Sequence, residues 1–353
     1  MNRVHINASS EYDVCIGDGL LQSLGDLCAD VLTGKGIAIL SDSNVWPIYG
    51  RTVITSLKQA GFGPIAECVI PAGEASKSGA TYLSVLNFLA ENHITRSDCI
   101  IAVGGGVVGD LAGFAAATFL RGISFIQVPT TLLAAVDSSV GGKTAIDLPA
   151  GKNLAGAFYQ PKLVVCDTAC LSSLPKEVFL DGCAEVIKYA ILFDPDLYAV
   201  LQKDGADFNR QAVIRRCVEL KRDTVSADEF DRGLRQKLNL GHTLGHGIEA
   251  NSNFTVSHGK AVAIGMVLAS RIAAQLGLCD QELPAKIQAL IYQFELPTET
   301  AVAPEELLQA ALSDKKRTGG TINLVLPLTI GNCILRSTPV EELPVLIAQG
   351  VSP

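Results

Sequence analysis

The sequence predicts two domains of different fold class. Residues 1–174 are expected to form an α/β domain with a Rossmann-like parallel sheet of non-standard type, and residues 175–353 a mainly α-helical domain. In the first half, short continuous apolar runs alternate with helical patterns, which is typical of a parallel sheet covered on both faces. After Leu174 the helical patterns follow one another, and a length of 353 residues fits two domains.

The elements of the first half follow from apolar patterning and from glycines at their ends. The strand-like runs are 36–42, 66–74, 98–106, 123–130 and 163–167. The helical patterns between them are 46–60, 78–92 and 107–119. The second half predicts helices at 176–192, 195–203, 209–226, 234–250, 259–276, 281–294 and 304–313, with 321–328 as its one strand-like run.

Composition excludes several classes of function. The net charge is −8, and the chain has neither a run of Lys and Arg nor an aromatic stacking pattern, so we expect no nucleic-acid partner. The N-terminus lacks the apolar core of a signal peptide, and no apolar run approaches the roughly 18 residues of a membrane span. The ten cysteines are scattered. We therefore expect a cytoplasmic protein with reduced thiols and no membrane partner.

A glycine-rich loop joins the predicted strand 98–106 to the helix that follows. The segment Gly104–Asp110 has the spacing G-x-G-x-x-G, and backbone N–H groups at a helix N-terminus bind phosphate. The alternative is a tight structural turn, because the loop lies far from the N-terminus and no acidic residue ends the next strand. Asp42, at the end of an earlier strand, is a candidate for holding ribose hydroxyls.

The stretch 128–158 combines hydroxyl side chains, glycines and two lysines, Lys143 and Lys152. Such a combination suits an anionic, polyhydroxylated ligand, although a solvated loop with turn residues is the alternative. Gly142, Lys143 and Thr144 match the end of a P-loop, but the upstream spacing of that motif is absent, which argues against an NTPase.

Three of the five histidines lie between Arg235 and His258. His242 and His246 are four residues apart and share one face of a helix, and His258 is the third. Neutral imidazole is the commonest transition-metal ligand, so a metal site is one interpretation. Hydrogen-bonded histidines in a core or cleft are the other.

Glu185 and Lys188 are three residues apart in an otherwise apolar helix. A buried glutamate needs a partner, so an ion pair within the helix is one interpretation. The other makes Glu185 an acidic metal ligand, since two histidines and a glutamate with an open position form a catalytic type of zinc site, and Lys188 a substrate contact.

Taken together, these motifs resemble the 3-dehydroquinate synthase family, from Asp42 to about Lys316. The resemblance is carried by DSNV at 42–45, GEASK at 73–77, GGGVVGDLAGF at 104–114, QVPTTLLAAVDSSVGGKTAID at 127–147, GKN at 151–153, EVIKY at 185–189, LNLGHTLGHGIE at 238–249 and HGKAVAIGM at 258–266. It implies binding of NAD and a divalent metal, zinc or cobalt, and a homodimer.

By position, the resemblance implies roles for individual residues. The implied metal ligands are Glu185, His242 and His258, so His246 instead faces the substrate and handles protons. NAD is expected to contact Asp42, Asn44, Glu74, Lys77, Gly105, Gly106, Val107, Asp110, Thr130 and Thr131, with Asp137, Lys143 and Lys152 near the nicotinamide end. The catalytic and substrate set is Arg121, Asp137, Lys143, Lys152, Asn153, Lys188, Lys221, Arg235, Asn239, His246 and one of Lys315 and Lys316.

The chain departs from the family pattern at three positions. Lys260 stands where the family usually has Glu, and Ala145 and Asp147 stand where Gly and Asn are common. We expect none of the three to touch a residue of the implied site.

The resemblance implies a reaction on a sugar phosphate, 3-deoxy-D-arabino-heptulosonate 7-phosphate. Oxidation at C5, phosphate elimination, re-reduction, ring opening and aldol closure would give 3-dehydroquinate, with NAD regenerated in each cycle. Two enzymatic alternatives are a cyclase acting on sedoheptulose 7-phosphate and a metal-dependent polyol dehydrogenase. A non-enzymatic nucleotide-binding protein is disfavoured, because it would be expected to have lost residues at 185, 242 or 258.

Overall fold

The structure is a computed structural model that describes residues 1–252, 255–312 and 320–351. The chain divides into two compact units. We call the first, Met1–Pro175 with Arg210–Phe230, the sheet unit, and the second, Lys176–Asn209 with Asp231–Pro353, the helical unit. The sheet unit includes α7 (Arg210–Ala227), a helix that the sequence assigned to residues 175–353.

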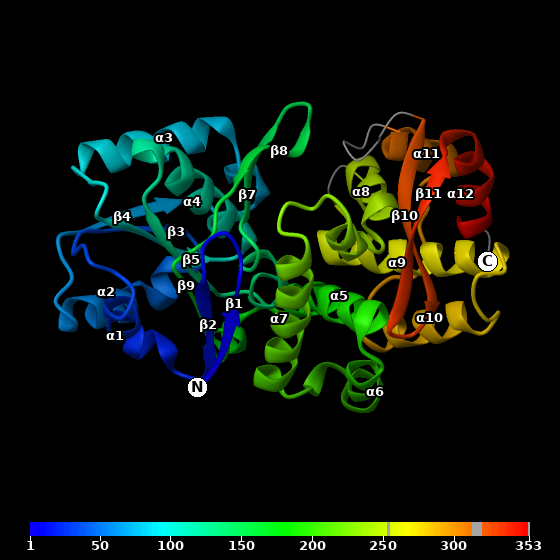
Figure 1. The fold of residues 1–353 in the computed structure, drawn as a ribbon, viewed down its shortest axis with the longest axis horizontal. Helices are drawn as coiled ribbons and strands as arrows, with labels where there is room; N and C mark the ends of the chain where they lie inside the picture. Colours follow the sequence, from blue (N-terminus) through cyan, green and yellow to red (C-terminus); the bar gives the residue numbers. More distant parts are fainter. Residues whose placement is uncertain (253–254, 313–319, 352–353) are drawn as a thin grey trace. The chain divides into compact units, whose positions relative to one another are not determined.

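A seven-stranded sheet forms the centre of the sheet unit (Figure 1). Its strand order is β1-β2-β9-β6-β5-β3-β4, and all neighbours are parallel except β1 and β2. The strands are β1 (Asn2–Ile6), β2 (Tyr12–Gly17), β3 (Ile37–Asp42), β4 (Ile65–Ile70), β5 (Cys99–Gly104), β6 (Ser124–Pro129) and β9 (Leu163–Asp167). The predicted α/β class with a parallel sheet is confirmed.

Both faces of the central strands β3, β5, β6 and β9 are buried, which explains why these strands are largely apolar. In β3, Ile37 and Ile39 pack in one core with side chains of α1 (Leu24–Ala29) and α2 (Trp46–Gln59). The alternate residues Ala38 and Leu40 pack in a second core with α3 (Gly79–Glu91) and α4 (Gly106–Thr118). Successive side chains of a strand point to opposite faces, so the helices form one layer on each side.

The sequence missed several elements of the sheet unit. Strands β1 and β2 and helix α1 were not predicted, and the stretch interpreted as a possible loop contains a hairpin of β7 (Lys143–Leu148) and β8 (Gly151–Phe158). The hairpin is glycine-rich and carries charged side chains, so its pattern hides the alternation typical of a strand.

The helical unit is mainly α-helical, as predicted. Its helices are α5 (Lys176–Phe193), α6 (Pro195–Asp204), α8 (His242–Asn251), α9 (His258–Gln275), α10 (Leu283–Gln293), α11 (Pro304–Leu312) and α12 (Leu343–Val351). β10 (Thr321–Thr329) and β11 (Asn332–Pro339) form an antiparallel pair. The sequence predicted neither β11 nor α12.

The predicted helix 234–250 was wrong as a single element. Residues Leu234–Asn239 form a 3-10 turn, and α8 begins only at His242. Gly241 separates them with a left-handed φ of 78°, which glycine adopts without strain. A Cβ at Gly241 would lie 2.5 Å from the carbonyl oxygen of Val262 in α9. The break therefore lets α8 start in close contact with α9.

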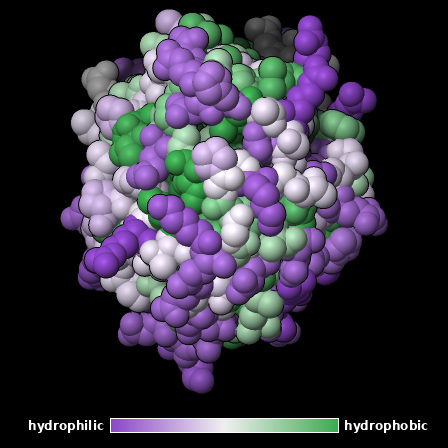
Figure 2. Space-filling model, turned by 90° about the vertical axis from the view of Figure 1, so that its left-hand side faces the viewer, coloured by the Kyte–Doolittle hydropathy of each residue, from purple (hydrophilic) through white to green (hydrophobic). Residues whose placement is uncertain are grey.

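Among the described residues, no helix combines the length and apolar character needed to cross a membrane. One face of the molecule is drawn in Figure 2, where hydrophilic side chains predominate and hydrophobic ones gather in smaller areas between them. Such a surface is expected where helices bury one side against a core and turn the other to solvent.

Candidate active site

The first group of predicted residues meets at the carboxyl edge of the sheet. β3 continues outward to β4, whereas β5 lies on the other side of β3 and leads to β6 and β9. The strands are all parallel here, but the side on which the next strand is added switches between β3 and β5. In open α/β sheets, ligands bind beside strand ends at such a point. Asp42 ends β3 and Gly105 follows β5, so the switch point lies between two residues predicted to contact NAD.

The glycine loop fits a phosphate group better than it fits side chains. Helix α4 begins at Gly106, directly after Gly105, and its first N–H groups have no partner within the helix. A Cβ at Gly105 would lie 3.1 Å from Cγ2 of Thr131, and one at Gly106 would lie 3.2 Å from Oγ of Ser138. The hydroxyl of Thr130 is buried with no hydrogen-bond partner in the described structure. The loop thus leaves backbone donors and an unused hydroxyl at the strand ends.

Several other predicted cofactor residues hold one another in place. One carboxylate oxygen of Asp42 accepts the N–H groups of Asn44 and Val45 at 2.9 and 3.0 Å. The buried ammonium of Lys77 lies 2.6 Å from the carboxylate of Asp110. Each contact orients a side chain before any ligand binds.

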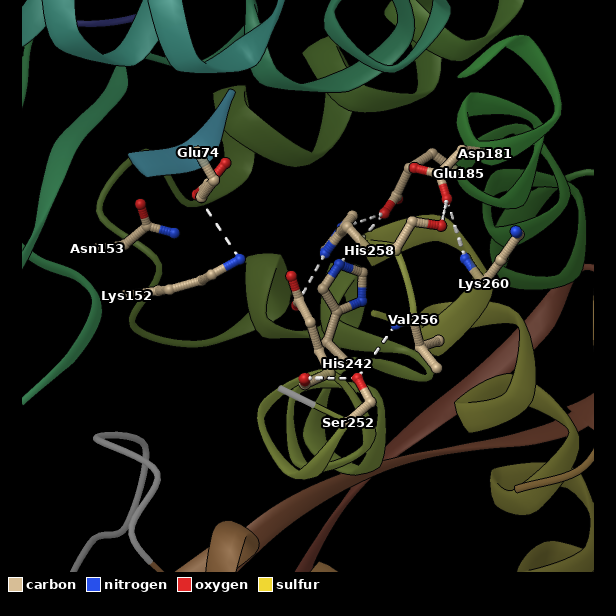
Figure 3. Close-up of polar contacts among 12 residues, drawn as sticks. Glu74, Lys152, Asn153, Asp181, Glu185, His242, Ser252, Val256, His258 and Lys260 are labelled. Atoms are coloured by element: carbon tan, nitrogen blue, oxygen red, sulfur yellow. Dashed lines mark hydrogen bonds and ion pairs between the residues drawn. The ribbon is translucent and has the colours of Figure 1, made fainter. Parts of the chain in front are cut away.

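Three further lysines of the sheet unit were predicted to contact cofactor or substrate, and two of them pair with predicted acidic residues. Lys221, on α7, donates to both the backbone and the carboxylate of Asp137 at 2.6 and 3.0 Å. Asp137 belongs to a single π-helical turn, Ala134–Ser138, a feature frequent at functional sites. Lys152 lies 3.7 Å from Glu74 (Figure 3). Lys143 begins β7 with an exposed side chain.

Arg121 does not join these residues. It follows α4 and precedes the amino end of β6, so it lies at the opposite edge of the sheet from the glycine loop. Its φ of 70° is left-handed, as is the φ of 50° at Leu120. Sequence alone could not separate Arg121 from the other predicted substrate residues, because edge position depends on strand direction.

The second site lies in the helical unit, where three predicted metal ligands converge. Nε2 of His242 and Nε2 of His258 lie 3.3 and 3.2 Å from the same oxygen of Glu185 (Figure 3). Among the described residues, these three form a group whose ligand atoms all lie within 4.8 Å of one another. Two imidazoles and one carboxylate are a donor set that suits zinc or cobalt.

Close packing of two helices creates this convergence. His242 is the first residue of α8 and His258 the first residue of α9. A Cβ at Gly265 of α9 would lie 2.0 Å from the carbonyl oxygen of Gly241, and one at Gly245 would lie 2.9 Å from that of Ala261. Only glycine permits this approach, which brings the two histidines together opposite the buried Glu185 of α5.

The outer nitrogen of each histidine also has an oxygen nearby. Nδ1 of His242 lies 3.0 Å from the carbonyl oxygen of Leu240, and Nδ1 of His258 lies 3.7 Å from the carboxylate of Glu249. Metal-bound histidines usually have such an outer partner, which fixes the ring orientation. Glu249 was not predicted as a site residue, although its spacing of seven residues from His242 places both on one face of α8.

Lys188 pairs with the outer oxygen of Glu185, and both side chains are only 1% exposed. Burial raises the pKa of Glu185, but the Lys188 ammonium, followed by His242, outweighs it and holds that pKa well below its usual range. The two interpretations of the Glu185 and Lys188 spacing are therefore compatible, since the ion pair exists while Glu185 faces both histidines.

The two histidines differ in charge without a metal. Burial lowers the pKa of His242, so the ring is neutral at pH 7. Burial also lowers the pKa of His258, but Glu185 and Glu249 outweigh it and raise the pKa to about 10. At neutral pH, a metal ion must therefore displace a proton from His258.

The other predicted residues of the helical unit are His246, Arg235, Asn239 and the late lysines. The exposed His246 lies one turn beyond His242 on α8, with ring centroids 5.5 Å apart. Arg235 is buried in the 3-10 turn, and Asn239 ends that turn. Lys315 and Lys316 lie outside the described residues.

Lys260 and Asp147, two of the three departures from the family pattern, differ in whether they contact a residue of the implied site. The backbone N–H of Lys260 donates to Asp181 at 3.1 Å (Figure 3), a contact that any residue can make. The expectation for Asp147 was wrong, because its carboxylate accepts the backbone N–H of Asn153 at 2.8 Å. The sequence offered no sign of this contact, since the hairpin itself was not predicted.

The fold and the two sites define a class of protein with a nucleotide-type α/β sheet and a glutamate–histidine metal site in a helical unit. The chain matches the family described as 3-dehydroquinate synthase N-terminal over residues 67–181 and its C-terminal counterpart over residues 182–317. A 3-dehydroquinate synthase from Pelobacter propionicus is 45% identical over 95% of each chain. The chain belongs to the 3-dehydroquinate synthase family.

Two solved structures share the fold over nearly their whole length. One is a 2-deoxy-scyllo-inosose synthase complexed with carbaglucose-6-phosphate, NAD+ and Co2+, with a TM-score of 0.88 and 25% identity over 98% of this chain and 99% of that one. The other is the 2-epi-5-epi-valiolone synthase ValA from Streptomyces hygroscopicus, with NAD+ and Zn2+ bound, a TM-score of 0.88 and 25% identity over 99% of each chain.

Proposed function

We propose that this protein converts 3-deoxy-D-arabino-heptulosonate 7-phosphate to 3-dehydroquinate and phosphate, as a carbon–oxygen lyase of the shikimate pathway. The observation that carries the proposal is the convergence of Glu185, His242 and His258 on one point, in a chain of the 3-dehydroquinate synthase family. The names of the relatives, and the NAD+ and metal ions bound in the two similar structures, support the same activity.

In this proposal Glu185, His242 and His258 hold a zinc or cobalt ion. When bound, the ion supplies Lewis-acid polarisation of an alcohol or ketone oxygen. The role of Glu185 is to give the site a fixed negative charge, because Lys188 keeps its carboxylate ionised. The leucine carbonyl beside His242 and the carboxylate of Glu249 beside His258 keep the Nε2 atoms directed inward.

The sheet unit is proposed to hold NAD, which when bound would accept a hydride from the substrate and later return it. Gly105, Gly106 and Val107 offer backbone donors to its pyrophosphate at the start of α4. Asp42, fixed by the N–H groups it accepts, is oriented toward ribose hydroxyls. Thr130 offers a hydroxyl with no partner in the described structure.

The remaining residues bind the sugar phosphate and move its protons. The cations Lys143, Lys152, Lys188, Lys221 and Arg235 are proposed to stabilise phosphate and developing negative charge, with Asn153 and Asn239 as amide contacts. Arg121 is left out of this set because it lies at the opposite edge of the sheet. His246 is proposed to shuttle protons between hydroxyls, a role that suits an exposed imidazole beside the metal site.

We also propose a homodimer in the cytoplasm. The resemblance to the family supports the dimer. The ten free cysteines support the location, because unpaired thiols are usual where the cell keeps cysteine reduced. Light scattering of the purified protein measures the oligomeric state, and fractionation of the source cells tests the cytoplasmic location.

An assay that follows both products tests the activity. The protein is incubated with the heptulosonate phosphate, zinc and a small fraction of one equivalent of NAD per substrate, while phosphate and dehydroquinate are followed. We expect equal amounts of both products and many turnovers for each NAD, because the hydride returns to the substrate.

Two results would contradict this proposal in different ways. Cyclisation of sedoheptulose 7-phosphate without activity on the heptulosonate would favour the rival cyclase. Accumulation of NADH with an unphosphorylated polyol would favour a dehydrogenase, which consumes NAD stoichiometrically.

Metal binding should release about one proton at neutral pH. His258 is charged in the metal-free protein because its pKa is about 10, and a ligand histidine must be neutral. The apparent affinity for zinc should therefore rise about tenfold per pH unit from pH 7 to 9 and level off above pH 10. Calorimetry in buffers of different ionisation enthalpy measures the released proton. A binding enthalpy that is the same in all buffers would contradict the prediction.

A further inference from the structure

Three hydrogen bonds form a closed ring between the hairpin and the segment that carries Lys77. The backbone N–H of Asp147 donates to the carbonyl oxygen of Lys77 at 2.8 Å. The carboxylate of Asp147 accepts the backbone N–H of Asn153 at 2.8 Å. The side-chain oxygen of Asn153 in turn accepts a hydrogen bond from the ammonium of Lys77 at 2.5 Å. Asp147 therefore takes part in two of the three bonds.

The ring lies at an irregularity in the hairpin. Ile146 pairs with Ala155 and Leu148 with Gly151, so Lys152, Asn153 and Leu154 together oppose the single residue Asp147. Bulges of this kind occur next to active sites, where they redirect a side chain. Here the bulge contains two residues proposed to bind cofactor or substrate.

Asn153 needs to be held in place. Its φ of 56° is left-handed, a region that asparagine tolerates better than most residues but does not prefer. Its side chain is exposed, whereas Lys77 is only 5% exposed. By accepting the backbone N–H of Asn153, Asp147 holds that backbone in place, and through it the direction of the amide.

Lys77 links this ring to the cofactor residues. Its ammonium also pairs with Asp110 at 2.6 Å, in the helix that follows the glycine loop. Burial lowers the pKa of Lys77, but Asp110, then Glu74 and Asp147, outweigh it and raise the pKa. Lys77 is thus a charged, buried group whose position depends on both Asp110 and Asn153.

We propose that Asp147 is a positioning residue for NAD binding, which holds the bulge so that Asn153 fixes the ammonium of Lys77. This inference rests on the proposed function, because it assigns Lys77 to the NAD site. Without Asp147, the backbone N–H of Asn153 loses its acceptor and the amide no longer stays against Lys77. Part of the binding energy of NAD is then spent on ordering Lys77 and the bulge.

The dissociation constant of NAD, measured by calorimetry on the zinc-loaded protein, tests the proposal. We expect Asp147→Ala to raise it about tenfold, the effect of losing a hydrogen bond to a charged acceptor. Asp147→Asn keeps an acceptor oxygen at the same place and should raise it less than about threefold. The neutral variant also serves as the test if the alanine variant does not fold, because it retains the ring.

Asp98→Ala is the matched control. Asp98 is also a loop carboxylate of the sheet unit that accepts backbone N–H groups, from Gly36 at 3.0 Å and Thr95 at 2.8 Å. It precedes β5 and so lies at the amino edge of the sheet. We expect a similar loss of thermal stability in Asp98→Ala and Asp147→Ala, but an unchanged NAD dissociation constant in Asp98→Ala.

The outcomes separate the two proposals. A wild-type protein that binds no NAD would overturn the proposed function and the role of Asp147 with it. A wild-type protein that binds NAD and forms dehydroquinate, with Asp147→Ala binding NAD as tightly as Asp98→Ala does, would overturn the positioning role alone. Equal weakening by Asp147→Asn and Asp147→Ala would also overturn it, because charge and not the retained acceptor would then matter.

Discussion

His242→Ala should abolish metal binding, whereas His246→Ala should leave it intact and remove activity. The imidazole of His242 points its Nε2 at the oxygen of Glu185 that also faces His258, at 3.3 Å. We expect its loss to weaken zinc binding more than about a hundredfold, beyond the 10- to 100-fold effect of changing an outer partner of a metal ligand. Removal of His246, a proposed proton shuttle, should lower kcat by about 10²- to 10⁴-fold.

The two variants control for each other. Both remove a histidine from the same face of α8, one turn apart, so general effects on the helix are similar. Zinc content after dialysis against a limiting zinc concentration measures binding, and phosphate release measures activity. Equal zinc loss in both variants would contradict the division of roles between His242 and His246.

Lys188→Met should strongly destabilise the metal-free protein. Lys188 and Glu185 are both 1% exposed, and the lysine neutralises the carboxylate that faces the two histidines. Without Lys188 the charged His258 is the remaining cation that faces Glu185 in the described part of the chain, and breaking a buried ion pair costs about 3–5 kcal/mol. Because zinc supplies positive charge at the other oxygen of Glu185, saturating zinc should stabilise the variant by more than it stabilises the wild type. Denaturant unfolding with chelator and with zinc measures both free energies.

Lys286→Met provides the comparison. Lys286 of α10 pairs at 3.0 Å with Glu282, the residue before this helix, but the side chains are 55% and 74% exposed. Exposed pairs contribute less than about 1 kcal/mol, and no metal ligand takes part, so zinc should stabilise this variant and the wild type equally. If Lys188→Met were no more destabilising in chelator than Lys286→Met, the proposed charge balance at Glu185 would be wrong.

Local patterns predicted most of the secondary structure, and their failures have physical causes. The largely apolar strands β3, β5, β6 and β9 were recognised because burial on both faces favours continuous apolar runs. The hairpin β7–β8 was missed because its short strands mix apolar residues with glycines and charged side chains, so the alternation of inward and outward positions is weak in the sequence. The break at Gly241 was missed because the reason for it lies in another helix, whose backbone approaches too closely for a side chain.

For the candidate sites, the sequence determined which kinds of residue are available and the tertiary structure decided which of them meet. Clustered histidines, a glycine loop after a strand and lysines among hydroxyls all pointed to metal and anion chemistry. Spacing favoured the pair His242 and His246, and the residue-by-residue resemblance instead implied Glu185 and His258 as partners of His242. The structure brings these three together because α8 and α9 pack through glycines and start at His242 and His258.

The link between Asp147 and Lys77 was decided by tertiary structure alone. Lys77, Asp110 and the hairpin that carries Asp147 and Asn153 are three separate segments of the chain, and no local pattern relates them. Hydrogen bonds between such segments depend on the register of the hairpin and on its bulge. A sequence pattern reports the preference of each segment for helix, strand or turn, whereas the distances within a site arise only when those segments pack.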